Sequence, residues 1–232
     1  MFIDSEDIKR VIPEVIKIRR HIHMYPEISE HEYETSKYIK KCLEEIGLEA
    51  NFIGDTGVVS MLMNNPEFQT VGLRAEMDAL PIEEETNLEF KSKNKGVMHA
   101  CSHDGIVATA LGVTKLLYEH KDELKCNVKF IFEPAEEVGR GAKKLIKEKV
   151  LENPTVDKMV IFHYANSAPI GMEIQKGVST ATLGRVSIEI IGKSSHWGEP
   201  EKGINAISVA AKVIDAIDKI NEDLKEKIQF VL

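Results

Sequence analysis

The sequence predicts an α/β protein in which a mostly parallel sheet is flanked by helices, followed by part of a second, smaller domain. Short β-type runs alternate with helical stretches over residues 1–178, an order typical of parallel sheets. From residue 179 the pattern changes to one strand, one long amphipathic helix and the opening of another strand. One strand, one helix and the start of a second strand are too few to form a complete domain by themselves. We therefore expect residues 179–232 to be incomplete as a domain.

Two helices are predicted near the N-terminus. Residues 8–22 carry apolar side chains at a spacing close to 3.6 residues, and the pattern stops at Tyr25 and Pro26. A second helix is expected to begin at Ser29, with Glu32 completing a capping box, and to end before Gly47.

The remaining elements follow from alternation and helical spacing in the same way. Strands are expected over 57–63, 70–75, 127–132, 158–162 and 182–191, with another opening at 228, and helices over 104–120, 141–149 and 204–223.

Composition excludes several classes of protein. The chain has 30 Lys plus Arg against 38 Asp plus Glu, a net charge of −8, which disfavours binding to nucleic acid. The most apolar stretch, Ile106 to Val113, is too short to span a membrane, and the acidic start does not resemble a secretory signal. Three cysteines without CxxC spacing argue against a disulfide framework. We predict a soluble cytoplasmic protein that binds neither nucleic acid nor membrane.

Reactive side chains gather where predicted strands end. Glu76-Met77-Asp78 follows one strand, Glu133-Pro134-Ala135-Glu136-Glu137 a second and His163 a third, while His99-Ala100-Cys101-Ser102-His103-Asp104 precedes a helix. In open α/β sheets, ligands bind beyond the carboxyl ends of the strands. These four segments are therefore expected to share one site.

Each segment also has an ordinary structural interpretation. Cys101 and His103 could be a buried thiol and a loop histidine, and the adjacent glutamates could begin a helix. His163 could be a structural histidine, and Asp78 could cap a turn.

Taken together, a thiolate, two imidazoles and a carboxylate suit zinc, cobalt, nickel or manganese. A second carboxylate beside a ligating one suits metal-assisted hydrolysis, because it can take a proton from the attacking water. The sequence has no GxSxG, GxGxxG or GxxxxGK[ST] motif, so serine-hydrolase, dinucleotide and P-loop interpretations lose support.

The four segments, beginning with Arg74-Ala75-Glu76-Met77-Asp78-Ala79-Leu80-Pro81 and ending with Phe162-His163, resemble the M20 metallopeptidase family. The resemblance is to its aminoacylase-like amidohydrolases, which include hippurate hydrolases, auxin-conjugate hydrolases and N-acetyl-diaminopimelate deacetylases. It implies a catalytic metal-binding domain over 1–178 and part of an α+β, ferredoxin-like lid and dimerisation domain over 179–232. It also implies one or two divalent metal ions and a homodimer formed through the lid.

The resemblance also implies residue roles. The metal ligands would be Cys101, His103, Glu137 and His163, the general base would be Glu136, and Asp78 would orient ligands without binding the metal itself. In the lid, His196 would stabilise the oxyanion or substrate carboxylate in a neighbouring subunit, and Asn205 would assist substrate binding. The alternative for His196 is a surface turn.

The sequence departs from the family pattern in three local places and in length. Ser102 replaces a glycine, Ile106 replaces a histidine, and Glu76 stands where many relatives have aspartate. Ser102 would be strained if its φ angle is positive. Because family members are considerably longer, we expect a C-terminally truncated sequence with uncovered apolar faces.

These observations predict a metal-dependent amidohydrolase that cleaves N-acyl amino acids or small peptides. Two alternatives stay open: a catalytically impaired relative that serves as a binding protein, and a carboxypeptidase or dipeptidase of the same clan.

Overall fold

The computed structural model describes residues 3–165, 171–172, 174 and 186–225. The chain divides into two compact units, Met1–Pro169 and Ile170–Leu232, and each is described by itself. The domain boundary expected between residues 178 and 179 lies outside the described residues.

The first unit is built on a mixed sheet with the strand order β1-β2-β4-β3-β5 among the described residues. The strands are β1 (Ala50–Ile53), β2 (Gly57–Leu62), β3 (Thr70–Glu76), β4 (Asn127–Glu133) and β5 (Lys158–Ile161). β3 is parallel to both of its neighbours, β4 and β5, whereas β2 pairs antiparallel with β1 and β4. The predicted α/β class is confirmed, and β1 adds an antiparallel edge that the sequence pattern did not reveal.

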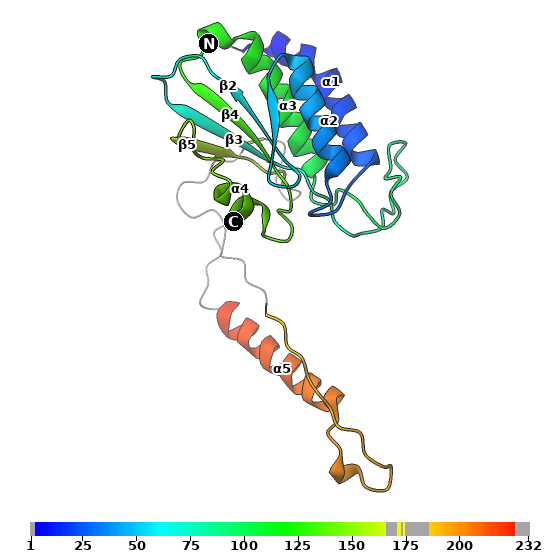
Figure 1. Ribbon diagram of the computed structural model, residues 1–232. Coiled ribbons are helices and arrows are strands. Elements are labelled where there is room, and N and C mark those ends of the chain that lie inside the picture. The colour runs from blue at the N-terminus through cyan, green and yellow to red at the C-terminus, as the bar shows by residue number, and fades with distance from the viewer. Residues whose placement is uncertain (1–2, 166–170, 173, 175–185, 226–232) are drawn as a thin grey trace. The chain divides into compact units, whose positions relative to one another are not determined.

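Helices cover both faces of this sheet. α1 (Ser5–Met24), α2 (Tyr33–Ile46) and α3 (His103–Glu119) lie together on one face, and α4 (Gly141–Lys147) lies on the other (Figure 1). A short 3-10 helix, η1 (Lys121–Glu123), follows α3. None of the helices in the described part of the chain is long and apolar enough to cross a lipid bilayer.

β4 is the centre of the core, since all of its residues are buried. Phe130 and Phe132 belong to the cluster packed by α1, α2 and α3, while Ile131 belongs to the cluster with Leu145 of α4. This alternation follows from the two-residue period of a strand. Burying each phenylalanine contributes about 1.5–3 kcal/mol.

The predicted start of the second helix was wrong. α2 begins at Tyr33 with Glu32 as its N-cap residue, and neither Ser29 nor Glu32 makes a side-chain cap. The Ser29 hydroxyl donates to Asp78, and the Glu32 carboxylate accepts from the Thr56 hydroxyl and the Ala135 N–H. Buried tertiary partners thus replace the local cap. The predicted end was right, because Gly47 closes the helix with φ 105°.

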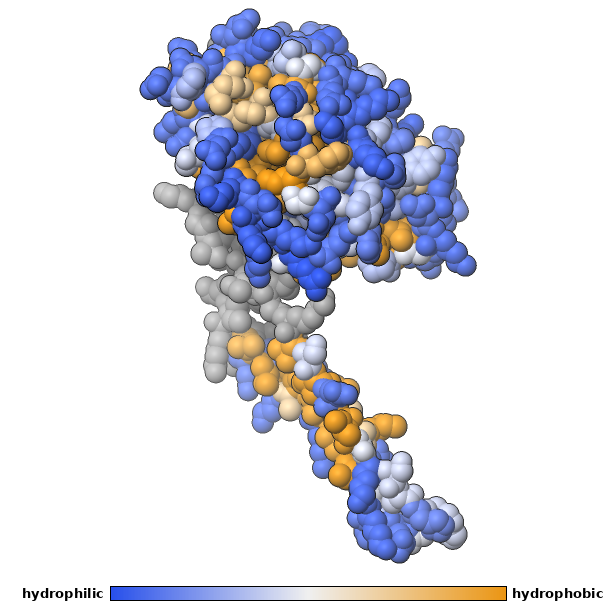
Figure 2. Space-filling model, in the orientation of Figure 1, coloured by the Kyte–Doolittle hydropathy of each residue, from blue (hydrophilic) through white to orange (hydrophobic). Residues whose placement is uncertain are grey.

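The second unit contains η2 (Pro200–Lys202) and α5 (Ala206–Lys225). Residues 186–191, the described part of the predicted strand 182–191, form no strand, because no described segment pairs with them. The strand expected from residue 228 lies outside the described residues. Figure 2 shows apolar residues along the described part of this unit. Ile207 of α5 is 81% exposed.

Candidate metal centre

The site lies at the edge of the sheet where β3, β4 and β5 end. Because these three strands run parallel, their carboxyl ends meet at one edge. Asp78 lies just beyond β3, Glu136 and Glu137 just beyond β4, and His163 just beyond β5. The predicted convergence of the strand-end segments is therefore present in the structure.

His103 is the buried member of the cluster and begins α3. Its Nδ1 lies 2.8 Å from the backbone oxygen of Asp78 and 3.3 Å from Asp78 Oδ1. A carbonyl oxygen can only accept, so Nδ1 donates, and in the neutral ring Nε2 carries the lone pair. That Nε2 atom is buried and has no hydrogen-bond partner among the described residues.

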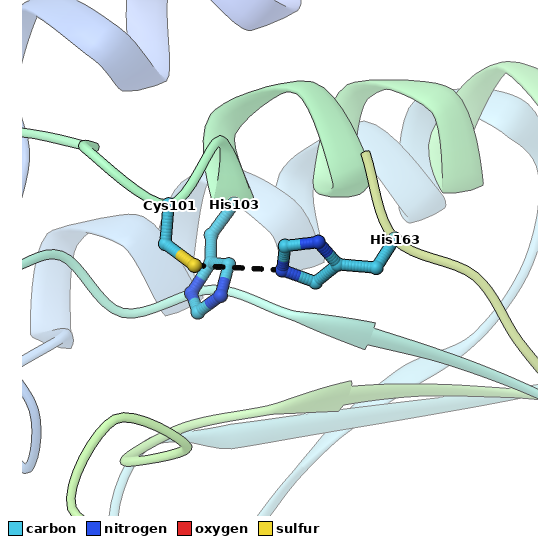
Figure 3. Close-up of side chains that lie close together, drawn as sticks. All are labelled: Cys101, His103 and His163. Carbon is cyan, nitrogen blue, oxygen red and sulfur yellow. Dashed lines mark hydrogen bonds between the residues drawn. The ribbon is translucent and has the colours of Figure 1, made fainter. Parts of the chain in front are cut away.

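Cys101 and His163 face each other across the site (Figure 3). Cys101 Sγ lies 3.5 Å from His163 Nε2, and His163 Nδ1 donates to the Tyr164 carbonyl oxygen at 2.8 Å. In both His163 and His103, Nδ1 therefore donates to a backbone carbonyl oxygen and Nε2 faces the cluster. A backbone or carboxylate partner on the second nitrogen is typical of metal-binding histidines.

The Tyr164 ring helps to place His163. Its hydroxyl lies 2.8 Å from Thr109 Oγ1 on α3. A Cβ at Gly105 would lie 2.9 Å from Tyr164 Cε2, so the absence of a side chain there permits this close approach.

Glu136 and Glu137 complete the cluster from the turn after β4. His103 Nε2 lies 3.9 Å from Glu136 Oε2 and 3.9 Å from Glu137 Oε1. The Glu137 N–H donates to Asp78 Oδ2 at 3.1 Å, and Ser29 Oγ donates to the same oxygen at 2.6 Å. Asp78 thus contacts both His103 and the glutamate turn. Both carboxylates are equally far from His103, so the division into ligand and base stays a prediction.

The turn that carries the glutamates is tightly held. Ala135 has φ 53°, and its N–H donates to the buried Glu32 carboxylate at 2.8 Å. A Cβ at Gly141 would lie 1.7 Å from the Pro134 carbonyl oxygen, so only glycine fits there. Arg74 donates to both Glu76 and Glu133, which joins the ends of β3 and β4.

The electrostatics of the cluster favour a bound cation. Burial, together with the negative charges of Glu137, Glu136 and Glu76, raises the pKa of the Cys101 thiol to about 11. Burial and the charge of Glu137 raise the pKa of Glu136. At Asp78 burial alone would raise the pKa, but contacts with His103, Ser29 and the Glu137 N–H lower it below its ordinary value. A divalent cation would relieve the repulsion among these anionic donors.

The donors fit a transition metal. Two groups of donor atoms, each within 4.8 Å of one another, share His103: one adds Cys101 and His163, and the other adds Glu136 and Glu137. Zn–S and Zn–N bonds of about 2.3 and 2.1 Å at a tetrahedral angle put sulfur and nitrogen about 3.6 Å apart, close to the 3.5 Å between Cys101 Sγ and His163 Nε2. Glu137 Oε1, like His103 Nε2, is buried without a hydrogen-bond partner among the described residues.

The departures from the family pattern have structural consequences. Ser102 has φ 62°, so the condition under which it would be strained is met. Ile106 is fully buried in the hydrophobic core. Glu76 is bound by Arg74.

The two residues predicted from the lid lie in the second unit. His196 is exposed, its ring lies 5.5 Å from that of Trp197, and its Nδ1 accepts from the Gly198 N–H. Asn205 Oδ1 accepts from the N–H groups of Ile207 and Ser208 at 3.0 and 3.2 Å, which is the geometry of a helix N-cap. Asn205 therefore caps α5, and the predicted roles of both residues stay predictions.

Sequence reasoning missed Ser29, Glu32 and the Tyr164 carbonyl as supports of the site. The first two lie before α2, far from the motifs in sequence, and no spacing rule connects them. The spacing of Ser29 and Glu32 resembles a capping box, and for that reason the two residues were interpreted as the start of a helix.

Fold and site together define a class: an α/β protein with a thiolate, imidazole and carboxylate centre at the carboxyl edge of its sheet. The chain belongs to peptidase family M20/M25/M40, whose family model matches residues 72–229.

Several known proteins are similar to it. The N-acetyl-L-cysteine deacetylase of Bacillus subtilis is 40% identical over 209 residues, which are 89% of this chain and 50% of the relative. Thermostable carboxypeptidase 1 of Saccharolobus solfataricus is 42% identical over 218 residues, 92% of this chain and 55% of the relative. The crystal structure of the Bacillus subtilis YXEP protein, described as a dinuclear metal-binding peptidase, matches with a TM-score of 0.65 and 38% identity over 72% of this chain and 46% of that one. The chain spans about half the length of the curated relatives it matches.

Proposed function

We propose that the chain supplies the metal centre of a metal-dependent amidohydrolase that cleaves the amide bond of N-acyl amino acids or small peptides. The observation that carries this proposal is the buried pair of atoms His103 Nε2 and Glu137 Oε1, unpartnered among the described residues and grouped with the donors of Cys101, Glu136 and His163. Family membership and a deacetylase relative support it.

One or two zinc, manganese, cobalt or nickel ions held by Cys101, His103, Glu137 and His163 would act as a Lewis acid toward the amide carbonyl. Asp78 fixes the tautomer and orientation of His103 through its backbone oxygen and carboxylate. Glu136 takes a proton from the attacking water at its carboxylate and returns it to the leaving nitrogen. Its raised pKa suits both steps, since a base must also become an acid.

The second unit would complete the active site in the assembled protein. We infer that residues 1–178 form the metal-binding domain and residues 179–232 part of a lid that joins two subunits. His196 would stabilise the oxyanion or substrate carboxylate in a neighbouring subunit, and Asn205 would assist substrate binding there. Exposure of His196 and Trp197 leaves this surface available for a partner subunit.

We place the protein in the cytoplasm. All three cysteines are free, and a thiol that serves as a metal ligand must stay reduced.

The proposal is tested by metal analysis and a substrate panel on the purified chain. Mass spectrometry should find about one or two ions per chain, and N-acetyl and N-benzoyl amino acids should be hydrolysed with added zinc, manganese or cobalt. Hydrolysis of peptides with a free C-terminus but not of N-acyl amino acids would instead indicate a carboxypeptidase or dipeptidase. Metal binding without turnover of any substrate would support a binding protein, and absence of metal would refute the centre.

Replacement of Glu136 by glutamine separates catalysis from metal binding. We expect a loss of about 100-fold or more in kcat, because a general base contributes at least that much, with the metal content unchanged. Glu137→Gln is the matched variant and should lower metal content as well. Retention of more than about a tenth of the rate in Glu136→Gln would exclude the base role.

A further inference from the structure

A groove between α1 and α2 lies apart from the metal cluster and shares none of its residues. Its volume is about 560 Å³, within the range of small-molecule sites. Its lining includes Lys17, Arg20, His21, Met24, Tyr38 and Lys41.

Aromatic rings form one wall of the groove. The His21 ring stacks on that of Tyr38, with centroids 4.0 Å apart and an angle of 24° between the planes. The Tyr25 ring lies 5.2 Å from that of His21 and is tilted by 50° against it. Aromatic side chains pack favourably with a further ring, either offset-stacked or edge to face.

Positive charge surrounds these rings. Lys17 and Arg20 lie three residues apart on α1, and neither has an ion-pair partner among the described residues. Within the described ranges the ion-pair partner of Lys41 is Glu45, at 3.7 Å, and Lys93 donates to the Tyr25 hydroxyl at 3.0 Å.

Two acidic groups also line the groove, and both have cationic neighbours. Glu14 is bound by Lys115, and Glu45 is the distant partner of Lys41. The balance of the lining stays positive in a chain whose net charge is −8. In agreement, burial and the charges of Lys17, Lys41 and Lys93 lower the pKa of His21.

We propose that this groove binds a small aromatic anion, an aryl carboxylate or sulfonate, whose ring packs on His21 and Tyr38 while Lys17, Arg20 and Lys41 hold its charge. A planar ring joined to an anionic group satisfies both the aromatic wall and the cationic rim. The inference does not depend on the proposed hydrolase activity.

The test is a titration of the whole chain, in metal-free buffer, with 2-naphthoate followed by amide chemical shifts in NMR. Two ligand controls accompany it: 2-naphthylmethanol keeps the ring without the charge, and acetate keeps the charge without the ring. We expect naphthoate to shift amides of α1 and α2 around the groove and both controls to bind much more weakly.

A matched pair of variants tests the charges. Lys17→Gln/Lys41→Gln removes one lysine of the groove from each helix, whereas Lys9→Gln/Lys37→Gln removes one from each helix outside it. We expect the first variant to weaken naphthoate binding about tenfold, because two modest charge contacts together amount to about one factor of ten in Kd. The second should leave Kd unchanged within about twofold.

Three results would overturn the inference. Equal binding of 2-naphthylmethanol would show an apolar groove without anion selectivity. Shifts confined to β5, α5 or the metal cluster would place the ligand elsewhere. Absence of any shift up to the solubility limit of naphthoate would show that the groove binds no such anion.

Discussion

At the scale of single residues, Ser102 is the clearest compromise in the structure. Its backbone has φ 62°, an angle that is unfavourable for a residue with a Cβ atom. Its hydroxyl makes no capping hydrogen bond to α3 that would offset this cost. We expect Ser102→Gly to raise the free energy of unfolding by about 1 kcal/mol, because glycine adopts this angle freely. Urea unfolding measures the change.

Ser102→Ala is the control for this substitution, because alanine keeps the Cβ atom. It should not stabilise the protein. A stabilisation by alanine equal to that by glycine would show that the backbone angle is not the cause.

The residue scale also shows how far the sequence could lead. Cys101, His103 and the adjacent glutamates could be found because short motifs and strand ends carry them. Ser29 and Glu32 could not, because their partners, Asp78 and Ala135, lie 49 and 103 residues away in sequence. Such contacts depend on the packed fold.

At the scale of elements, a buried ionic network joins α1 to the N-terminus of α3. His23 Nδ1 lies 2.9 Å from Asp104 Oδ2, and His23 Nε2 lies 3.2 Å from Glu84 Oε1. Arg19 also contacts Asp104 Oδ2, at 3.1 Å. The hydrogen bond to Asp104 is the largest influence on His23, and together with Glu84 it outweighs burial and raises the pKa of His23 above 6.5.

This raised pKa gives stability a defined dependence on pH. The folded state binds the proton of His23 more tightly than the unfolded state does. The contribution of protonated His23 to the free energy of unfolding is therefore complete below about pH 6.5, the ordinary pKa of histidine. It is lost as the pH rises through the raised pKa of His23 in the folded protein. We expect the urea midpoint to fall over that window in the wild type and to lose this dependence in His23→Gln.

His31→Gln provides the control, since His31 is exposed. At low pH His23→Gln should cost about 1–3 kcal/mol, because it leaves the buried Glu84 without a charged partner and Asp104 with Arg19 alone. A pH dependence that persists in this variant would assign it to another group.

Elements differ in how well a single sequence predicts them. The strands from β2 to β5 were found as short runs of apolar and β-branched residues, and the long helices from apolar residues spaced close to 3.6 apart. β1 was missed because its residues show the burial order B-e-e-i, without alternation. The expected strand over 182–191 has strand-like spacing, but its described residues have no partner strand, and spacing alone does not supply one.

At the scale of the whole molecule, the centre ties α3 to the ends of three strands. A metal that binds only the folded chain should therefore stabilise the first unit as one body. At a free zinc concentration of 100 times Kd, we expect about 2.7 kcal/mol of added stability. Thermal unfolding with zinc and with a chelator measures the difference.

Two cysteine variants make this prediction specific. Cys101→Ala should abolish most of the stabilisation by zinc, whereas Cys126→Ala should preserve it, since Cys126 is not part of either donor group. Equal loss in both variants would assign the effect to general thiol binding.

The parallel pairing of β5 with β3 bears on synthesis at the ribosome. Val71 pairs with Lys158, so β3 leaves the ribosome long before the strand that will cover its open side. Folding during translation proceeds from the N-terminus, and His103, Glu136 and Glu137 emerge before His163. A nascent chain therefore completes the group of His103, Glu136 and Glu137 first and acquires its second imidazole last.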